Sequence, residues 1–533
     1  MITDLLFEHF ATLATAPDGI ARLRELILQL AVQGKLGTQD AGDEPAGALL
    51  ETIKKQIRKI NGNGSREKEI SPFNDKKIPF ILPKNWVWTQ IGTICTPTQY
   101  GWTTQASTFG EIHLLRTTDI TSGNINWDTV PYCSEVPTDL EKYLITDGDI
   151  VISRAGSVGE SHLIKNPRKS VFASYLIRFK PMINRDYFAF FLKSPYYWSV
   201  ISDESLGTGV PNVNATKLRN CYFPLPPLAE QQRIVVKVNQ LMALCDELEA
   251  RQQQERAGCL KLGTASLAGL QDAKSPEEFG LQWAQVCDAF DLILDCPENV
   301  AVLRQTILQL AVQGLLTNDR SSVINRHPKK WRLATLSDII IDKKDGMRTG
   351  PFGSMLKKYE HLLNGVPVFG IENVKKMKFL PGNKVFISKE KAEQLKNYNV
   401  KFNDILITRS GTVGEICVVP DGIQEGRISS NLMRLRLNLE VCDPHFLCLI
   451  LYGSKTVLEK IDEQCVGSTR TFIDGKILKS LTFPLPPLAE QHRIVAKVNA
   501  LMALCDALDT RLKERAGVQS KFADAVIKNV RIG

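Results

Sequence analysis

The chain has 533 residues and a formal net charge of +8 at pH 7, with 43% hydrophobic and 23% charged residues. It is too long for one hydrophobic core and has the composition of an ordinary globular protein, so we predict three or four structural units. No stretch approaches the roughly 18 uninterrupted apolar residues of a membrane span, and Asp4 and Glu8 do not fit a signal peptide. We therefore expect a cytoplasmic protein with no membrane partner.

The twelve cysteines are scattered along the chain, and no two of them form a C-x-x-C pair. The seven histidines do not lie at metal-ligand spacing to them, so we predict no metal site. Cys245 and Cys505 occupy matching positions in two repeated segments, where a free cysteine is most simply a small apolar core residue.

Residues 1–36 form a predicted N-terminal helical region, in which apolar residues recur at helical spacing and Gly34 can end the helix. The sequence ILQLAVQG of residues 27–34 returns at residues 307–314, which predicts an equivalent helix over residues 301–313. Residues 37–82 are largely polar, and we interpret them mainly as a linker with a short basic helix around residues 53–60. The apolar positions of the first helix are Ile20, Leu23, Ile27, Leu30 and Ala31.

Residues 83–222 are predicted to form a first globular domain. Strand-like runs at residues 112–116, 148–154 and 171–179 are separated by glycine-rich turns. Residues 187–199 have the pattern of an aromatic-rich amphipathic helix. The mixture of strands and helices predicts an α/β (α+β) domain.

A second domain, residues 328–482, repeats this plan. Its residues 403–415 mirror residues 148–160, and its residues 446–460 mirror the aromatic helix. Elsewhere the two domains differ in length and sequence. Duplication of one domain, followed by divergence of its loops, is the simplest explanation.

A 26-residue segment occurs twice almost unchanged, at residues 223–248 and again 260 residues later. The prolines of its FPLPP sequence cannot lie inside a helix, so the helix should begin near Leu228. Gly258 and Gly517 would end the two helices, which gives each about 28 residues and, at 1.5 Å per residue, about 40 Å of length. We predict a central helical spacer over residues 223–327 and a C-terminal one over residues 483–533.

Apolar residues in the two helices follow steps of four and three, which is the pattern of a coiled-coil seam. The simplest partner for each seam is the other long helix, running antiparallel, so that one chain has a pseudo-twofold internal repeat. The predicted partner or coiled-coil residues are Ile234, Val238, Leu241 and Leu248 in the first helix and Ile494, Val498, Leu501 and Leu508 in the second.

The positive charge is concentrated in one of the two domains. Residues 328–482 contain 25 basic and 17 acidic residues, whereas residues 83–222 contain 13 basic and 12 acidic residues. The segment between them, residues 223–327, contains 9 basic and 13 acidic residues. A basic excess of this kind indicates a polyanionic partner, although solvated lysines are common on any surface.

Polar loops that recur in both domains are the best candidates for binding such a partner. Residues 154–159 (RAGSVG) and 409–414 (RSGTVG) combine glycine N–H groups, hydroxyl groups and an arginine, which suit phosphate oxygens. Two further loop pairs, residues 101–110 with 346–354 and 207–214 with 467–474, differ in side chains, as base-reading elements would. The candidate DNA-binding residues are Arg154, Ser157, Arg409, Thr412, Thr103, Thr104, Arg348, Thr349, Thr208, Asn212, Asn214, Ser468 and Arg470.

Each of these assignments has a plainer alternative. Arg154 and Arg409 can equally serve to fix tight turns, and ordinary loop drift explains the differing side chains equally well. Asp149 and Asp404 precede the repeated glycine loops and are most simply turn residues at the entry of a strand. The sequence contains no G-x-x-x-x-G-K-[ST] phosphate loop and no Asn-Pro-Pro-aromatic methylase motif, so we predict no catalytic residue.

Taken together, the repeated PLPPLAEQ-x-RIV-x-KV helix, the D-I-[VL]-I-[ST]-R-x-G-x-V-G-E loops and the order domain, helix, domain, helix resemble the specificity subunit of a type I restriction-modification system. The resemblance covers nearly the whole chain. It implies a non-catalytic subunit with two target recognition domains, each reading one half of a split, asymmetric site in double-stranded DNA. From the predicted helix length, the half-sites would be centred about one DNA turn apart.

The resemblance also implies partners for this chain. Two methylation subunits would dock on the helices and bind S-adenosylmethionine, and motor-nuclease subunits would use ATP and Mg²⁺, so this chain itself would bind no cofactor. Two other classes of function remain open: a stand-alone sequence-specific DNA-binding regulator and a structural coiled-coil adaptor. Only the first of these would bind its DNA sequence tightly without a partner.

Overall fold

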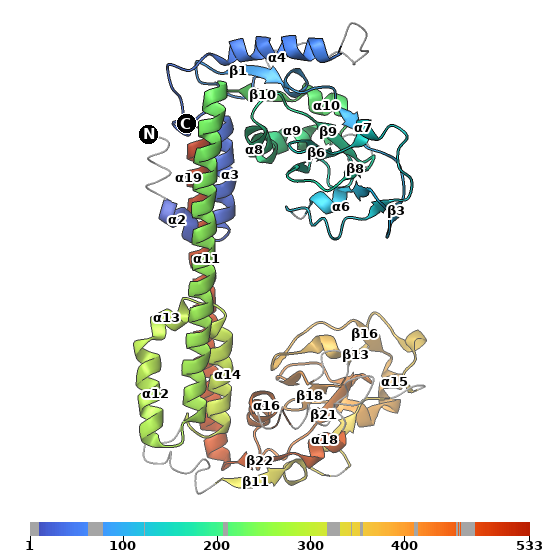
Figure 1. Ribbon diagram of the computed structural model, residues 1–533. Coiled ribbons are helices and arrows are strands. Elements are labelled where there is room, and N and C mark those ends of the chain that lie inside the picture. The colour runs from blue at the N-terminus through green and yellow to red at the C-terminus, as the bar shows by residue number, and fades with distance from the viewer. Residues whose placement is uncertain are drawn as a thin grey trace. The chain divides into compact units, whose positions relative to one another are not determined.

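The computed structural model describes residues 10–61, 78–121, 123–205, 212–316, 331–342, 344–351, 355–409, 414–454, 457, 459 and 475–532. The chain forms two compact units, one of residues 1–253 with 515–533 and the other of residues 254–514. Each unit combines a sheet-containing domain with a group of packed helices (Figure 1). Among the described residues, no helix is both long and apolar enough to span a membrane.

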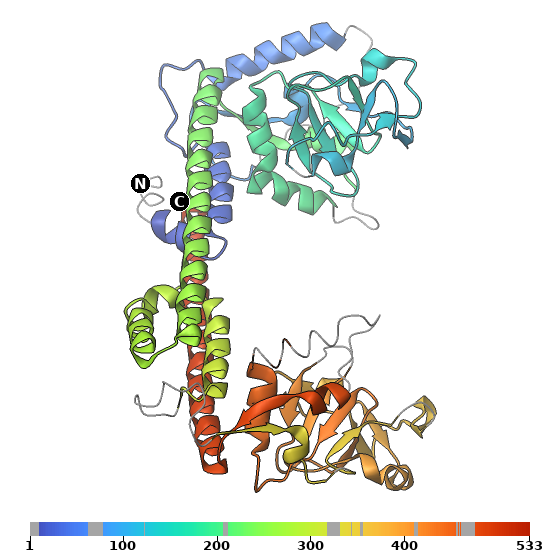
Figure 2. The ribbon, with the colours of Figure 1, turned by 60° about the horizontal axis from the view of Figure 1, so that its bottom comes forward.

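In the first unit, three helices pack side by side: α3 (Gly19–Val32), the first half of α11 (Leu228–Asp272) and the last turns of α19 (Leu488–Ile532), as Figure 1 and Figure 2 both show. Arg24 joins α3 to α11 through ion pairs with Asp246 at 2.8 Å and Glu249 at 2.6 Å. Arg22 joins α3 to α19 through Asp524 at 2.9 Å. The shared core contains Leu23, Ile27, Ile234, Val238, Leu241, Cys245, Ala523 and Val526.

The second unit repeats this arrangement with α14 (Asn299–Val312) in the place of α3. Arg304 of α14 pairs with Asp506 at 2.8 Å and Asp509 at 2.7 Å on the first half of α19. The predicted equivalence of the two short helices is therefore confirmed. Two further helices, α12 (Pro276–Asp288) and α13 (Phe290–Leu294), pack on the second half of α11, where Leu267, Leu270, Val286 and Ile293 form a small core.

In each unit the first half of one long helix accompanies the last part of the other, which confirms the antiparallel repeat. The short helix is an additional partner of the seam that the heptad pattern did not predict. The predicted helix ends are wrong, because α11 and α19 each contain 45 residues. Gly258 and Gly517 lie inside them in open space, so the predicted half-site spacing is no longer supported by a helix length of 28 residues.

The first domain contains two four-stranded sheets. One has the order β2-β9-β6-β7 and the other β3-β5-β4-β8, and a separate pair, β1-β10, adjoins α11. The strands are β1 (Val87–Gln90), β2 (Gln99–Tyr100), β3 (Ala106–Ser107), β4 (His113–Leu115), β5 (Tyr132–Cys133), β6 (Ile150–Ser153), β7 (Ser161–Leu163), β8 (Ser170–Phe172), β9 (Leu176–Phe179) and β10 (Tyr222–Leu225). The helices of the first unit besides α3 and the long helices are α2 (Phe10–Thr15), α4 (Ala46–Asn61), α5 (Ile91–Ile94), α6 (Thr117–Ile120), α7 (Leu140–Tyr143), α8 (Arg185–Lys193), α9 (Pro195–Ser205) and α10 (Ala215–Asn220).

The second domain has the corresponding sheets β12-β21-β18-β19 and β16-β13-β20-β17 and the corresponding pair β11-β22, with an added hairpin β14-β15. Its strands are β11 (Arg332–Thr335), β12 (Met347–Thr349), β13 (Val366–Phe369), β14 (Val374–Lys375), β15 (Lys378–Phe379), β16 (Val385–Ile387), β17 (Asn399–Val400), β18 (Ile405–Thr408), β19 (Ile416–Val418), β20 (Gly426–Ile428), β21 (Leu432–Leu435) and β22 (Thr482–Leu485). Among its described residues, the α-helices are α15 (Lys389–Gln394), α16 (Pro444–Gly453) and α18 (Gly475–Ser480). Short 3-10 helices are η4 (Leu336–Asp338), η6 (Lys358–Glu360), η7 (Ile371–Asn373) and η8 (Lys396–Tyr398).

Three elements differ from their prediction. The aromatic helix expected over residues 187–199 is two helices, α8 and α9, because Pro195 begins a new helix and cannot continue the hydrogen bonding of α8. The single run expected over residues 171–179 is divided between β8 and β9, which lie in different sheets. The short basic helix expected around residues 53–60 is confirmed as part of α4, but α4 begins earlier, at Ala46, and buries Leu50 and Ile53, so less of this segment is linker than we predicted.

A glutamine from each repeated AEQ sequence ties a domain to its long helix. The Gln231 side chain accepts a hydrogen bond from the Asn184 N–H at 2.9 Å and donates one to the Pro226 carbonyl at 2.9 Å. Gln491 repeats both bonds with Asp443 and Pro486, each at 2.8 Å. Both glutamines are fully buried, so the helix and the first turn of the domain helix are held in the same way twice.

Candidate functional site

In the first domain, the glycine loop, the end of β2 and the segment before α10 meet around one arginine. The guanidinium of Arg154 lies 5.2 Å from the centre of the Tyr100 ring. The Val213 N–H donates to the Arg154 carbonyl at 3.0 Å, and Asn212 pairs with Ala155 as an isolated β-bridge. Residues that lie far apart in sequence, and that we predicted from separate loops, are thereby brought together.

The Tyr100 hydroxyl completes this cluster by accepting a hydrogen bond from the Ala215 N–H at 2.9 Å. Asn214 is exposed, but its side-chain oxygen caps α10 by accepting from the Lys217 N–H at 2.9 Å. Sequence patterns gave no signal for Tyr100, because a single aromatic residue at a strand end is common.

The loop after β2 leads away from Arg154. The hydroxyl of Thr104 lies 2.9 Å from that of Ser134 and accepts from the Glu135 N–H at 3.2 Å, so it fixes a neighbouring loop. Thr103 is exposed, as is Ser157 in the glycine loop. Of the remaining predicted residues, Thr208, Thr412, Ser468 and Arg470 lie outside the described residues.

Gly101 and Gly350 occupy the same position in the two domains. Their N–H groups donate to the Leu176 and Leu432 carbonyls, and a Cβ at either glycine would lie within 2.1 Å of a backbone oxygen. The loop beginning at Gly101 therefore corresponds to the one beginning at Gly350, and the match we predicted with Gly346 is wrong.

The strand register accounts for this error. In the second domain Ile340 pairs with Leu437, and Arg348 pairs with Arg434. The equivalent pairs of the first domain are Cys95 with Pro181 and Gln99 with Arg178. Eight positions separate Ile340 from Arg348, but only four separate Cys95 from Gln99. The second domain thus has four extra residues before β12, and Arg348 and Thr349 take the places of Gln99 and Tyr100.

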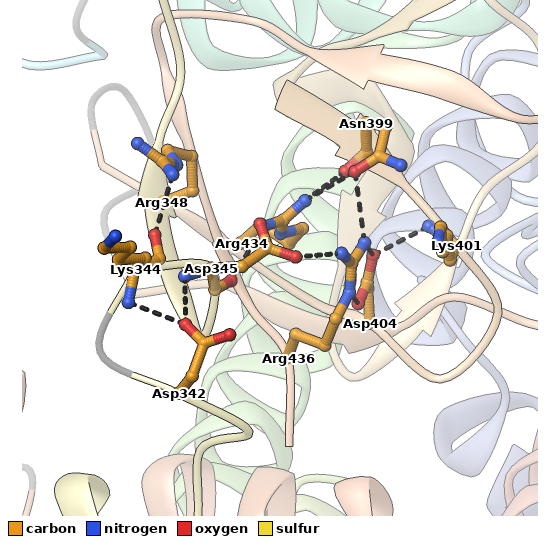
Figure 3. A network of polar contacts seen from close by, with 9 residues as sticks. All are labelled: Asp342, Lys344, Asp345, Arg348, Asn399, Lys401, Asp404, Arg434 and Arg436. Atoms are coloured by element: carbon orange, nitrogen blue, oxygen red, sulfur yellow. Dashed lines mark hydrogen bonds and ion pairs between the residues drawn. The ribbon is translucent and has the colours of Figure 1, made fainter. Parts of the chain in front are cut away.

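The extra residues contribute to a partly buried charge network, which Figure 3 shows. Asp345 lies in the insertion and pairs with both Arg434 and Arg436 of β21 and its extension. Arg436 also donates to Asp404 through Nε at 2.7 Å and Nη2 at 2.8 Å. Arg434 is fully buried and donates to the Asn399 side chain at 2.9 Å.

This network supports the site from within the sheet, although Asp345 itself is 35% exposed. Partial burial opposes ionisation of Asp345, but hydrogen bonds and charge from Arg434, together with Arg436, hold the pKa of its carboxyl below the ordinary value. The insertion is thereby pinned to β21, and Arg348 donates to the Lys344 carbonyl within it at 2.7 Å. Sequence reasoning missed the network, although an arginine at matching positions of two apolar strands, Arg178 and Arg434, was a usable signal.

Asp149 and Asp404 confirm the plainer interpretation as turn residues. Their carboxylates accept from the N–H of Thr146 at 2.9 Å and of Lys401 at 2.7 Å, three residues earlier. Both are buried and face basic residues of the adjacent strand. They are structural groups of the sheet.

Two of the predicted arginines keep free donors in the described part of the chain. The Nε atoms of Arg154 and Arg348 are buried and have no hydrogen-bond partner among the described residues. Arg409 starts the second glycine loop, and its N–H donates to the Asn431 carbonyl at 2.8 Å as that of Arg154 donates to Tyr175 at 2.9 Å. Guanidinium donors at loop positions suit phosphate oxygens or base-edge acceptors.

The predicted coiled-coil residues mostly face the interior of their own unit. Ile234, Val238, Leu241, Ile494 and Val498 are buried, and Leu248, Leu501 and Leu508 are partly buried. Cys245 and Cys505 are buried with them, as expected of small apolar core residues. The surface that the repeated helices leave uncovered is the opposite one, on which Leu244 is 47% and Leu504 66% exposed.

Comparison with known proteins agrees with the repeated architecture. A family model described as the type I restriction modification DNA specificity domain matches residues 107–256 and 328–516. The specificity subunit of the type I restriction enzyme EcoEI from Escherichia coli is 26% identical over 566 aligned positions, which cover 95% of this chain and 93% of the relative. That of EcoAI, also from Escherichia coli, is 26% identical over 567 positions with the same coverage.

A solved structure is similar in fold. A chain from work on complex assembly and conformational transition of the type I R-M system has a TM-score of 0.53 at 20% identity, covering 85% of this chain and 99% of that chain. The family model matches well over half of the sequence, in two separate copies that coincide with the two domains and the helices that follow them. The chain therefore belongs to the family of DNA specificity subunits of type I restriction-modification systems.

Proposed function

We propose that each domain reads one half of a bipartite, asymmetric site in double-stranded DNA. The observation that carries this proposal is one backbone frame that occurs twice with different side chains at its loop positions. Gln99 and Tyr100 in the first domain are replaced by Arg348 and Thr349 in the second, at the same register against the neighbouring strand. Different donors and acceptors at one position of a common frame suit two different half-sites.

The chemistry of the clusters supports this assignment. Arg154 and Arg348 are half-buried arginines with several guanidinium donors, and the exposed Asn212 has an amide that can both donate and accept. Such groups contact guanine, adenine and phosphate in DNA complexes.

The long helices supply the second half of the proposal, which is docking of two copies of one methylation subunit. Each repeated segment contains the same MAL sequence, and its alanine and leucine lie on the exposed side, with Leu244 and Leu504 projecting from it. Two near-identical surfaces suit two identical partners, and an exposed leucine at each is an apolar anchor for an interface. On this proposal S-adenosylmethionine is bound by the methylation subunits, ATP and Mg²⁺ by motor-nuclease subunits, and this chain selects the DNA.

The decisive experiment exchanges one domain and maps the methylated sequence. Residues 83–221 are replaced by the corresponding domain of another specificity subunit, and the complex with methylation subunits modifies genomic DNA. We expect the base sequence of one half-site to change and that of the other half-site to stay the same. The reciprocal exchange of residues 328–482 is the matched control and should alter the other half. A change in both halves from either exchange would contradict independent reading by two domains.

A further inference from the structure

The hairpin of β14 and β15 in the second domain has an unusual turn. Val374 pairs with Phe379 and Lys375 with Lys378, which leaves Lys376 and Met377 as a two-residue turn. Both turn residues have positive φ, 46° and 64°. Such turns favour asparagine and glycine, and a left-handed conformation costs other residues about 1 kcal/mol or more each.

Several contacts hold this turn in place beside the glycine loop. The Lys376 N–H donates to the carboxylate of Glu415, and Glu415 directly follows Gly414, the last residue of the loop. Met377 packs against the core that contains β18 and β19. Val374 and Phe379 belong to the adjacent core, so the tip is anchored on both sides.

The hairpin displays three like charges at close range. Lys375, Lys376 and Lys378 are all exposed, and Lys375 stands directly opposite Lys378. None of them forms an ion pair within the part of the chain that the structure describes. Like charges on directly opposed strand residues are destabilising, so the arrangement has no evident benefit for the fold.

The corresponding segment of the first domain lacks these three charges. In the first domain the Arg116 N–H donates to the Asp119 side chain at 2.8 Å, and in the second the Gly370 N–H donates to the Asn373 side chain at 2.9 Å. These equivalent hydrogen bonds align the residues that follow them in the two domains. Gly123, with φ of 85°, thus corresponds to Met377. Thr121, Ser122 and Asn124 stand in the sequence where the second domain has its three lysines.

We propose that the tip of the β14-β15 hairpin is a contact for DNA phosphates, made by the second domain only. This inference rests on the proposed function, because it presumes that the neighbouring glycine loop faces DNA. A strained turn that is anchored from beneath and displays unpaired ammonium groups suits a row of phosphates, which would remove the mutual repulsion of the lysines. The hairpin supplies affinity and orientation, while the loops around Arg348 and Arg409 supply sequence information.

The test replaces the three lysines by the residues of the first domain, Lys375→Thr, Lys376→Ser and Lys378→Asn. Affinity of the complex with methylation subunits for its own DNA site is measured between low and high salt. We expect the slope of log K against log salt to become shallower by about 2 to 3, from ~0.9 per phosphate contact, with the methylated sequence unchanged. Replacing all three by arginine should preserve the slope.

The matched control removes the same charge elsewhere in the second domain. Lys384, Lys389 and Lys396 are exposed, and the substitutions Lys384→Thr, Lys389→Ser and Lys396→Asn should leave the slope nearly unchanged. Equal slope changes in the two triple variants, or none in the hairpin variant, would overturn the hairpin contact. Either result is distinct from failure of the proposed function, which would appear as a domain exchange that alters both half-sites or neither.

Discussion

Asp404 and Asp149 occupy one position in the duplicated sheet but interact with their basic neighbours differently. Arg436 donates two hydrogen bonds to Asp404, at 2.7 and 2.8 Å. The nearest basic atoms to Asp149 lie at 3.6 Å on Lys180 and 3.9 Å on Arg178. We therefore predict that Asp404→Asn destabilises the second domain far more than Asp149→Asn destabilises the first.

The expected magnitudes follow from these contacts. Asparagine can still accept the turn hydrogen bond from the N–H three residues earlier, so both substitutions mainly remove a charge. Asp404 is 1% exposed. Without its charge, the Arg436 guanidinium keeps only one of its two carboxylate partners in the sheet, which costs about 3 kcal/mol of stability. Arg178 already donates to the Leu144 and Lys142 carbonyls at 2.7 and 3.0 Å, so Asp149→Asn should cost about 1 kcal/mol or less.

Amide hydrogen exchange on the intact chain measures the two effects separately. About 3 kcal/mol corresponds to roughly 100-fold faster exchange at β18 and β21 in Asp404→Asn, since 1.4 kcal/mol is a factor of ten. Peptides of β6 and β9 serve as an internal reference within the same molecule. Equal acceleration in the two variants, or less than about tenfold at β18 in Asp404→Asn, would refute the assignment of stability to the Arg436 hydrogen bonds.

Three further outcomes are expected. Leu504→Glu and Leu244→Glu should each weaken binding of one methylation subunit by about tenfold or more, which native mass spectrometry of the complex measures. Val518→Glu should not weaken it, because Val518, which at 68% is about as exposed as Leu504, lies on α19 outside the repeat. Burial raises the pKa of Glu230, although hydrogen bonds from Trp86 and Thr38 oppose this shift. The stability that Glu230 contributes is therefore fully present below the ordinary glutamate pKa and is lost as the pH rises through the raised pKa. Glu230→Gln should remove that loss, so that the Tm of the variant varies less with pH over this window than the Tm of the unchanged protein. If the two curves of Tm against pH were parallel, ionisation of Glu230 would not lower the stability. Inserting one heptad into both α11 and α19 should lengthen the DNA spacer by about three base pairs, from ~10 Å of added helix, if these helices set the spacing; an unchanged spacer in the methylated motif would exclude that role.

The repeated sequences predicted most of the fold because identical segments form identical contacts. The ILQLAVQG and PLPPLAEQ repeats correctly predicted α3, α14 and the starts of α11 and α19. The ion pairs of Arg24 and Arg304 recur at the same sequence spacings as these two repeats. The helix ends were not predictable from glycine alone. Gly258 and Gly517 lack a neighbour within 4 Å, and an exposed glycine in a long helix costs only about 1 kcal/mol, which packing elsewhere exceeds.

The site was predicted less completely than the fold. Arg154 and Asn212 are recognisable because loop glycines and polar residues surround them, and the structure brings them together. Tyr100 and Asp345 were missed, because their roles arise from contacts with strands that are distant in sequence. A four-residue insertion in a low-similarity loop is also invisible until the strand register fixes both of its ends.

That insertion indicates how the two domains differ in the contacts that hold their loops. Asp345 lies within it and neutralises Arg434 and Arg436, whereas the corresponding Arg178 of the first domain is satisfied mainly by backbone carbonyls. The loop before β12 is therefore held by charge, and the loop before β2 is not. Placing an arginine at Gln99 alone would not reproduce the position of Arg348, because the first domain lacks both the insertion and the carboxylate that pins it to the sheet. Transfer of DNA specificity between such domains should thus require the buried partners of a loop together with its exposed residues.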